Sequence, residues 1–521
     1  MAISLRVPQR RPSLDELLFA GLLLLYLVPV WAFRFIPTQD GPSHLDTANV
    51  MRLYSRPEGE PYRKYFDLTR DLDPYWTVDL LLKGLMDVVP PLTAEKILVT
   101  MYVLLFPLSV RYLVRSVDPR RDYLSWLAFP LMMGYWFHMG FYHYCLGLSL
   151  YCWITGLWLR QQARVTPAGL AALAALSVVL YFTHPFPGDV LVLTLIVLAG
   201  WTALREKKSV PPGTLLVFLP FLVLLGSFSL AILAHPPRPP VDAPYALSDA
   251  WTFLLSPDTL ASFSRTQIPM LRIEGLLFFV LLAWAAAKKI AARRLEPGGG
   301  LLCLFVFLLV LYFFLPAWQL MSRRMIVFIA LAAIAWLATV PFGRLASRAI
   351  RVAAFTLAAL WAVDLTVQYA KWNPALEEAA SLSGSIRPGS TLLYLPFAFP
   401  WQEDQIRFNP YRHFGNAVAA ERNLVSFNNY EANEPYLPLQ YKAGMNPYEL
   451  IGCPEVQDPV NLEGYAKTGG TIDYVLLWVA RPGNVSLLAD ALIRPQLNRG
   501  FDLIGTSSGR RAFLYRRKGF V

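Results

Sequence analysis

Residues 17–46 read LLFAGLLLLYLVPVWAFRFIPTQDGPSHLD, a long apolar run that ends at a polar turn. The apolar part, from about Leu17 to Phe35, is long enough for a helix that crosses the hydrocarbon core of a bilayer. Basic residues precede this run, and no small-residue cleavage site follows it. We therefore expect an uncleaved first transmembrane helix rather than a signal peptide.

The composition of the whole chain also favours a membrane protein. Its 521 residues are 55% hydrophobic and 16% charged, with a mean hydropathy of +0.40, whereas soluble domains carry roughly 25% charged residues. The net charge of +11 would suit nucleic acid if it formed one patch, but the Lys and Arg residues cluster in short loops between apolar runs. We therefore expect membrane lipid as a partner and no nucleic acid.

Further apolar runs predict an α-helical polytopic membrane protein with about 11 transmembrane helices. Basic clusters fall in alternate loops, which places the N-terminus in the cytoplasm by the positive-inside rule. An odd number of spans then places the C-terminal part outside. The expected spans are residues 16–36, 93–115, 122–139, 142–160, 167–184, 188–204, 213–234, 273–291, 299–317, 324–341 and 349–368.

The hydropathy divides the chain into a transmembrane domain, residues 1–370, and an extracytoplasmic soluble domain, residues 371–521. Short β-like runs separated by Gly, Pro and Asn predict a small α/β fold for the soluble domain. The first outer loop, residues 37–92, is long enough to hold helices near 42–55 and 76–89. In the second of these helices, charged residues recur every four positions, which predicts a helix in the membrane interface rather than a span.

The six histidines all map to the outer side of the predicted topology or to the outer ends of spans. Histidines accumulate at interfaces for reasons unrelated to function, and that explanation stays open. The alternative is a polar cavity at the outer membrane face. The histidines are His44, His138, His143, His184, His235 and His413.

Asp40 stands where the chain leaves the first span, one helical turn before His44 if a helix begins at Pro42. A carboxylate at a low-dielectric boundary has a raised pKa and can act as a general base. Asp before a Pro-initiated helix is also a common N-cap, and one role does not exclude the other. Asp46 would point elsewhere on the same helix and is the weaker candidate.

Other polar residues at outer turns are candidates for substrate binding. His138 and His143 lie in FHMGFYHY (137–144), and His184 lies in THPFPGD (183–189). Arg323 and Arg324 break the positive-inside pattern, so they either snorkel to the interface or hold a phosphate by forked hydrogen bonds. No Walker loop, GxGxxG, HExxH or GxSxG motif competes with this site, and the four cysteines form no metal-binding pattern.

An Asp at the outer end of the first span, a long outer loop with two helices and an outer α/β domain together resemble the GT-C superfamily. GFYHYCLGLSL (140–150) and YFTHPFPG (181–188) are similar to segments of little-characterised bacterial members of that superfamily. The resemblance implies a multi-pass protein of the bacterial inner membrane that takes a sugar from a polyprenyl-phosphate carrier. It also implies that Asp40 is the catalytic carboxylate and that basic groups near the outer face hold the carrier phosphate.

One residue departs from the pattern. Protein mannosyltransferase and aminoarabinose transferase members have an Asp-Glu pair after the first span, whereas Gly41 follows Asp40 here. Either His44 or Asp46 substitutes for the missing Glu, or transfer activity has been lost. A divalent metal bound by Asp40 and His44 is compatible with these residue types.

The leading hypothesis is therefore an inverting membrane glycosyltransferase that moves a sugar from a polyprenyl-phosphate donor to a lipid, glycan or protein acceptor on the outer face. Asp40, His44 and Asp46 are the catalytic candidates. The substrate-binding candidates are His138, His143, His184, Arg323 and Arg324. A non-enzymatic transporter or lipid-handling protein, or a scaffold whose outer domain binds partners, are the alternatives. The sequence does not indicate an oligomeric state.

Overall fold

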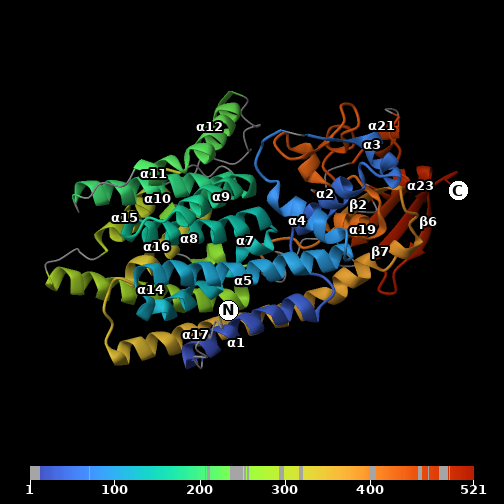
Figure 1. Cartoon of the computed structure of the whole chain (residues 1–521). Coiled ribbons are helices and arrows are strands. Elements are labelled where there is room, and N and C mark those ends of the chain that lie inside the picture. The colour runs from blue at the N-terminus through green and yellow to red at the C-terminus, as the bar shows by residue number, and fades with distance from the viewer. Residues whose placement is uncertain are drawn as a thin grey trace, which may run out of the picture.

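A bundle of apolar helices forms most of the computed structural model, with a mixed β-sheet at one end (Figure 1). The helices of the bundle lie roughly along one axis, and the sheet caps that axis. The structure describes residues 12–69, 71–205, 207, 212–234, 250–251, 254, 257–292, 298–315, 321–397, 406–455, 460–466, 469–479, 491 and 493–520.

Five helices among the described residues are long and apolar enough to cross a membrane. Their apolar side chains need no hydrogen-bond partners in lipid, and their backbone N–H and C=O groups form hydrogen bonds within each helix. Further apolar helices pack beside them, so the chain is a multi-pass membrane protein. The five are α1 (Leu14–Ala32), α5 (Pro91–Val117), α10 (Pro185–Leu204), α14 (Ser264–Ala291) and α17 (Arg344–Ala380). The others are α8 (Tyr142–Ala163), α9 (Pro167–Thr183), α11 (Pro212–Leu216), α12 (Leu219–Ala234), α15 (Gly299–Tyr312) and α16 (Met321–Leu337).

The segment 122–139, which we predicted as one span, is not a continuous helix. It forms η2 (Pro119–Ala128), α6 (Phe129–Met132) and α7 (Tyr135–His138). Pro130 and Gly134 interrupt it, and a Cβ at Gly134 would lie 2.7 Å from the backbone oxygen of Leu260. Apolar composition predicted a span here but did not reveal these breaks.

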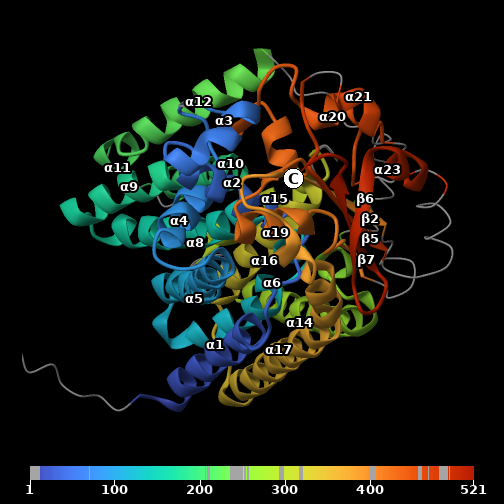
Figure 2. The same ribbon diagram turned by 90° about the vertical axis from the view of Figure 1, so that its right-hand side faces the viewer.

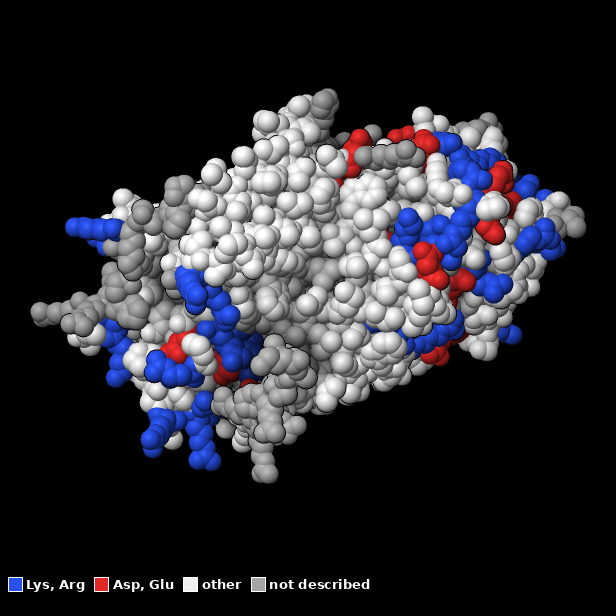
Figure 3. Space-filling model, in the orientation of Figure 1, with Lys and Arg blue, Asp and Glu red and all other residues white. Residues whose placement is uncertain are grey.

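On the face of the molecule in Figure 3, charged side chains gather at the two ends and leave an uncharged band between them. The end opposite the sheet carries mainly Lys and Arg, whereas the end with the sheet carries both signs. Such a band is the surface that a bilayer requires, because charged groups at its centre are costly.

The segment predicted as the first outer loop, residues 37–92 and called the outer loop below, contains the two expected helices, α2 (Gly41–Leu53) and α4 (Thr77–Met86). It also contains η1 (Pro57–Gly59) and α3 (Glu60–Tyr65). The charged stripe expected on α4 does not face the membrane interface as a whole. Asp79 is only 2% exposed and points into the protein, whereas Asp87 is exposed. The four-residue spacing placed these carboxylates on one helix face, but Asp79 belongs to the buried side of α4.

The C-terminal part contains a five-stranded mixed sheet with the order β3-β2-β5-β7-β6. Figure 2 labels β2, β5, β6 and β7 of this sheet. β2 runs parallel to β3 and β5, and β7 runs antiparallel to β5 and β6. β2 and β5 are apolar and buried along their full length, as expected for strands covered on both faces. The strands are β2 (Thr391–Phe397), β3 (Val425–Ser426), β5 (Tyr474–Val479), β6 (Phe501–Thr506) and β7 (Ala512–Arg517). The short helices here are η5 (Ser383–Ser385), α19 (Phe414–Arg422), η6 (Tyr430–Asn433), α20 (Pro447–Leu450), α21 (Leu462–Ala466) and α23 (Arg494–Gly500); η3 (Pro257–Leu260) precedes α14.

The outer loop and the C-terminal part share one hydrophobic core. β1 (Phe66–Leu68) of the loop pairs antiparallel with β4 (Leu439–Tyr441), and α2 packs against α19. Val50 and Tyr62 of the loop pack in the same cluster as Leu393 of the sheet. This shared core fixes the position of α2, and therefore of Asp40 at its start.

Candidate active site

A cavity of about 540 Å³ lies where the helix bundle, the outer loop and the C-terminal part meet. Residues from all three regions line it, and many of them can carry charge. The titratable side chains on its wall include Asp40, His44, His143, His184, Arg324 and Glu431. The structure therefore brings together five of the predicted site residues, although they lie far apart in the sequence.

Asp40 begins α2, and its backbone is held by the turn before α8. Its N–H donates to the carbonyl of Met139 at 3.0 Å, and the N–H of Gln39 donates to the carbonyl of His138 at 2.9 Å. Asp40 occupies the N-cap position, but its side chain makes no capping hydrogen bond. The carboxylate accepts a hydrogen bond from Gln39 Nε2 at 3.2 Å and lies 3.5 Å from His413 Nε2. It is therefore directed at the site rather than used as a cap.

Burial raises the pKa of Asp40 above its ordinary value, although His413, Arg412 and Gln39 oppose the effect. Only 5% of the residue is exposed. When cationic neighbours offset only part of the effect of burial, a buried carboxylate is a stronger base than one in water. Asp40 is therefore suited to accept a proton from a bound group.

His413, from the residue before α19, links Asp40 to a second buried carboxylate. Its Nδ1 lies 3.6 Å from Glu455 Oε1, and its ring packs on Tyr430 at a centroid distance of 4.7 Å. Burial alone would raise the pKa of Glu455, but His413 and the Tyr448 hydroxyl bring it below its ordinary value. We predicted His413 to lie among the outer histidines but not beside Asp40, because no local pattern joins the two segments.

The structure explains why Gly41, and not Glu, follows Asp40. A Cβ at Gly41 would lie 2.3 Å from Thr38 Oγ1 and 2.6 Å from the Tyr142 hydroxyl. The facing Gly140 has φ +84°, and a Cβ there would lie 2.3 Å from the Gly41 nitrogen. The backbone of the turn before α8 thus packs directly on the start of α2, and a larger side chain at position 41 does not fit.

The Tyr142 hydroxyl that fills the space at Gly41 donates a hydrogen bond to Glu95 Oε1 of α5 at 2.7 Å. Tyr142 also lies 3.3 Å from Thr38 Oγ1. A buried carboxylate is therefore present behind the Asp-Gly turn, supplied by another helix rather than by the residue next to Asp40.

His44 belongs to a cluster of imidazoles and carboxylates on the cavity wall. His44 Nδ1 lies 2.6 Å from Glu431 Oε1 and 3.6 Å from Asp79 Oδ1, and His143 Nε2 lies 3.7 Å from the same Asp79 oxygen. Burial disfavours the charged form of His44, but Glu431 and Asp79 outweigh burial and raise the pKa of His44 well above its ordinary value. His44, Asp79 and His143 have a spacing that could hold a metal ion. Asp40, which we had paired with His44 as a metal ligand, faces His413 instead.

Arg324 and His184 form the cationic wall of the cavity. Arg324 is 9% exposed, and its guanidinium lies over the ring of Phe141, 4.5 Å from the centroid. His184 Nδ1 accepts the backbone N–H of Phe186 at 3.1 Å, so in the neutral ring Nε2 carries the proton. That Nε2 lies 3.4 Å from Arg324 Nη1. Two donors thus face the same space, which is a favourable place for an anion.

Tyr75 lies over the two histidines, with ring centroids 5.6 Å from His143 and 5.0 Å from His184. Its φ of +72° is in the left-handed region, which costs a non-glycine residue of the order of 1–3 kcal/mol. The loop is held in place by the Tyr181 hydroxyl, which donates to the carbonyl of Leu72 at 2.7 Å. Surrounding contacts thus keep Tyr75 at the cavity in a strained conformation.

The other predicted site residues do not line this cavity. His138 is fully buried, with Nδ1 2.8 Å from Ser262 Oγ and Nε2 3.1 Å from the Tyr369 hydroxyl. Asp46 faces the C-terminal part and accepts a hydrogen bond from Asn429 at 3.0 Å. Arg323 is half-buried on α16 and lies outside the cavity wall, and His235 is not among the described residues.

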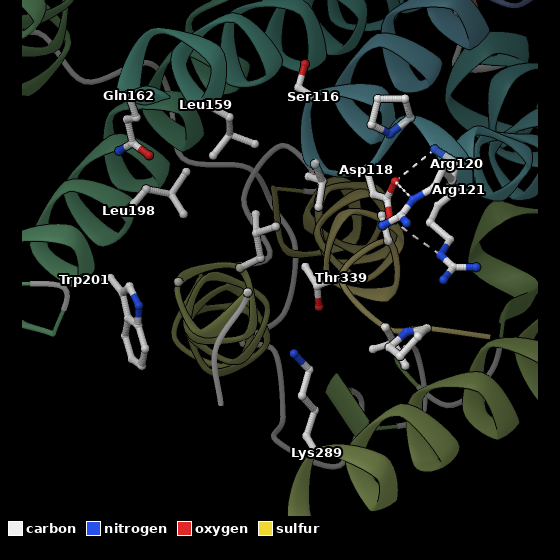
Figure 4. Close-up of a pocket in the computed structure, with 18 of the residues that line it drawn as sticks. Ser116, Asp118, Arg120, Arg121, Leu159, Gln162, Leu198, Trp201, Lys289 and Thr339 are labelled. Carbon is white, nitrogen blue, oxygen red and sulfur yellow. Dashed lines mark hydrogen bonds and ion pairs between the residues drawn. The ribbon is translucent and has the colours of Figure 1, made fainter. Parts of the chain in front are cut away.

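A larger cavity of about 1250 Å³ lies at the other end of the bundle, where α5, α14 and α16 end and α15 begins (Figure 4). Asp118 there pairs with Arg120 at 3.0 Å and with Arg121 at 3.8 Å. The described residues of its wall, unlike those of the first cavity, include no histidine, and their one carboxylate, Asp118, is paired with arginine. We therefore do not regard this cavity as the reaction site.

The apolar bundle, the outer loop closed on a mixed sheet and the buried Asp after the first helix make up a polytopic membrane fold, as predicted. The fold is similar to the crystal structure of ArnT from Cupriavidus metallidurans bound to undecaprenyl phosphate, with a TM-score of 0.50. The similarity covers 97% of this chain and 98% of that chain, at 12% sequence identity. No protein-family model and no curated protein matches the sequence.

Proposed function

We propose that the protein is a membrane glycosyltransferase that moves a sugar from a polyprenyl-phosphate donor to a lipid, glycan or protein acceptor. The solved protein with the same fold binds undecaprenyl phosphate, and the uncharged band fits a donor that stays in the bilayer. We expect the basic end of the bundle to lie in the cytoplasm of a bacterial cell, because basic loop residues concentrate on the cytoplasmic side of a membrane. In the proposed topology, with about 11 spans, the cavity opens to the outer face.

One observation carries this proposal: a buried carboxylate with an imidazole partner and a buried guanidinium line the same cavity. Within the part of the chain that the structure describes, no carboxylate forms an ion pair with Arg324, and its Nε has no hydrogen-bond partner. An acceptor hydroxyl or amine needs a base, and a departing phosphate needs a cation. Asp40 and Arg324 supply the two groups.

The donor phosphate is assigned to Arg324 and His184. Their facing donors at 3.4 Å repel each other slightly in the absence of an anion, and a phosphate oxygen between them would accept from both. Burial of Arg324 strengthens such a contact because little water competes for it. Tyr75 would cover the phosphate from the loop side.

An adjoining apolar cavity of about 290 Å³ suits the start of the polyprenyl chain. Its wall contains Phe228, Ile232 and Leu233 of α12, and it shares Tyr75, His184, Arg324 and Tyr436 with the first cavity. A phosphate at Arg324 could therefore continue directly into an apolar slot. The slot would leave the sugar on the side of Asp40.

In the proposed reaction, the acceptor atom attacks the anomeric carbon while Asp40 removes the acceptor proton. The bond between the anomeric carbon and the phosphate oxygen breaks, and its electron pair stays on the phosphate, which leaves with the polyprenyl chain. Attack opposite the leaving group inverts the anomeric centre. His413, held by Glu455, keeps the Asp40 carboxylate oriented, and His143 shapes the acceptor side.

The test is turnover by the purified full-length protein in lipid nanodiscs supplied with polyprenyl-phosphate sugars and a panel of acceptors. Release of free polyprenyl phosphate reports transfer whichever acceptor receives the sugar. Wild-type protein should release it, and Asp40→Asn should not. Glu274→Gln, which alters a buried carboxylate on α14 away from the cavity, should retain activity. Full activity of Asp40→Asn would refute the proposed base.

A further inference from the structure

The larger cavity, at the basic end of the bundle, takes no part in the proposed transfer reaction. Its volume is about 1250 Å³, compared with about 540 Å³ for the cavity at Asp40. Residues of α5, α8, α10, α14 and α15 line it, together with η2 and the segment that follows α16. Ligand sites in proteins commonly have volumes of about 300–1000 Å³, so this cavity is large enough to hold a ligand of its own.

Positive charge predominates on the wall of this cavity. Its described residues include one carboxylate, Asp118, and four cationic side chains, Arg120, Arg121, Lys288 and Lys289. Asp118 accepts two hydrogen bonds of 3.0 Å from Arg120, but it lies 3.8 Å from Arg121 Nε. The side chain of Arg121 is 15% exposed, and its Nε is buried without a hydrogen-bond partner in the described part of the chain. One carboxylate cannot neutralise this wall, and Arg121 has a donor to offer to an anion.

The start of α15 adds the positive end of a helix to the same wall. Gly298, with φ +100°, precedes α15, and its position at the N-cap provides no side-chain hydrogen bond to the helix. The first N–H groups of a helix have no acceptor within it and lie at the positive end of its dipole. Residues 298–300 are all glycine, so they have no side chains of their own to shield these groups. Phosphate groups bind readily at helix starts of this kind.

The other side of the cavity is apolar. Leu159 of α8 and Leu198 of α10 lie there with Trp201, across the cavity from Arg120 and Arg121 (Figure 4). Tryptophan is enriched where a transmembrane helix meets the membrane surface, and Trp201 lies in the last turn of α10. The cavity therefore has a charged side and an apolar side near the bilayer surface. This combination fits a lipid better than a soluble anion.

We propose that this cavity binds an anionic phospholipid from the membrane leaflet at the basic end of the bundle. The headgroup phosphate would lie among Arg121, Lys289 and the start of α15, and the acyl chains would extend along the apolar side. Basic pockets between transmembrane helices are suited to anionic headgroups. Phosphatidylcholine has the same phosphate but also a quaternary ammonium group, which the cationic wall would repel. The site should therefore select lipids by net charge, and this selection does not depend on transferase activity.

The test is native mass spectrometry of the full-length protein, delipidated in detergent and titrated with phosphatidylglycerol or with phosphatidylcholine of the same acyl chains. Wild-type protein should prefer phosphatidylglycerol, and Arg121→Gln/Lys289→Gln should bind it about 10- to 100-fold more weakly, as expected for lost hydrogen bonds to a charged group. The matched control is Arg344→Gln/Arg348→Gln, which removes two exposed arginines of α17 outside the cavity and should bind like wild-type protein. Equal losses in the two double variants, or no preference between the two lipids, would overturn the proposal.

A second measurement covers the case in which Arg121→Gln/Lys289→Gln does not fold. Phosphatidylglycerol should raise the thermal unfolding midpoint of wild-type protein more than phosphatidylcholine does. The same rise should persist in Arg324→Gln, which alters only the cavity at Asp40, and its loss there would assign the lipid to that cavity and overturn the proposal. Inorganic phosphate at the same concentration as the lipid should neither stabilise the protein nor displace phosphatidylglycerol. Displacement by inorganic phosphate would identify a site for a free anion and would also overturn the proposal.

Discussion

Asp40 and His413 face each other across the contact between the outer loop and the C-terminal part, with Oδ1 and Nε2 3.5 Å apart. His413 in turn lies 3.6 Å from Glu455. The candidate base thus depends on a side chain that the C-terminal part supplies. The C-terminal part is therefore a component of the site and not merely an appended domain.

Transfer should require ionised Asp40. Burial raises the pKa of this carboxyl above its ordinary value, so kcat should fall as pH decreases, with a midpoint above the ordinary value of about 3.9. The same raised pKa means that ionisation of Asp40 lowers the free energy of unfolding. This loss of stability is absent at low pH and develops as pH rises through the raised pKa. The measurement is the pH dependence of kcat. A rate that stays constant down to the ordinary pKa would contradict the assignment.

Removal of the His413 side chain should shift that pH profile. His413 lowers the pKa of Asp40, so His413→Gln should move the acidic limb of the kcat profile to higher pH. It should also reduce kcat at its optimum, by less than the roughly 10²- to 10⁴-fold expected for Asp40→Asn. If His413 had a purely structural role, His413→Gln would lower the amount of folded protein without moving the acidic limb of the kcat profile.

Substitutions of Arg324 and Arg323 should differ in their effects on the KM for the donor. Only Arg324 lines the cavity. Loss of a hydrogen bond to a charged group costs about 1.5–3 kcal/mol, so Arg324→Gln should raise the KM for the donor about 10- to 100-fold. Arg323→Gln is the matched control and should change it little. An equal rise in the KM for the donor in the two variants would show that the donor phosphate does not bind at Arg324.

A side chain at position 41 should destabilise the protein. The Cβ of Gly41→Ala would overlap Thr38 Oγ1 and the Tyr142 hydroxyl, a form of overpacking that costs about 1–3 kcal/mol. Thermal unfolding in detergent measures the change, with Gly21→Ala on α1 as the control because a Cβ there meets nothing within 4 Å. Unchanged stability of Gly41→Ala would show that the turn can relax, and a Glu at this position would then fit.

Local patterns predicted much of this fold. Apolar length predicted α1, α5 and α10, and Pro42 predicted the start of α2. The turn sequences before α8 and α10 predicted that His143 and His184 lie near the outer end of the bundle. These features depend on neighbours along the chain, which the sequence displays directly.

The partners of these residues could not be predicted in the same way. Asp79 was treated as part of an exposed stripe, because helical periodicity shows which residues share a face but not whether that face is buried. Glu431 and His413 reach the site only after β1 and β4 have paired and α2 has packed on α19. Contacts of this kind depend on the tertiary arrangement, so a short stretch of sequence does not predict them.

Helix α17 runs without interruption from Arg344 to Ala380, through the point near residue 370 where the hydropathy changes. Its 37 residues span about 55 Å, and Asn373 holds the backbone of Phe35, between α1 and Asp40, through bonds of 2.8 and 3.0 Å. Because one continuous helix joins the bundle to the C-terminal part, the C-terminal part has little freedom to rotate relative to the bundle. A change in bilayer thickness that tilts α17 would thus alter the alignment of His413 with Asp40, so that the geometry of the site would depend on the surrounding membrane.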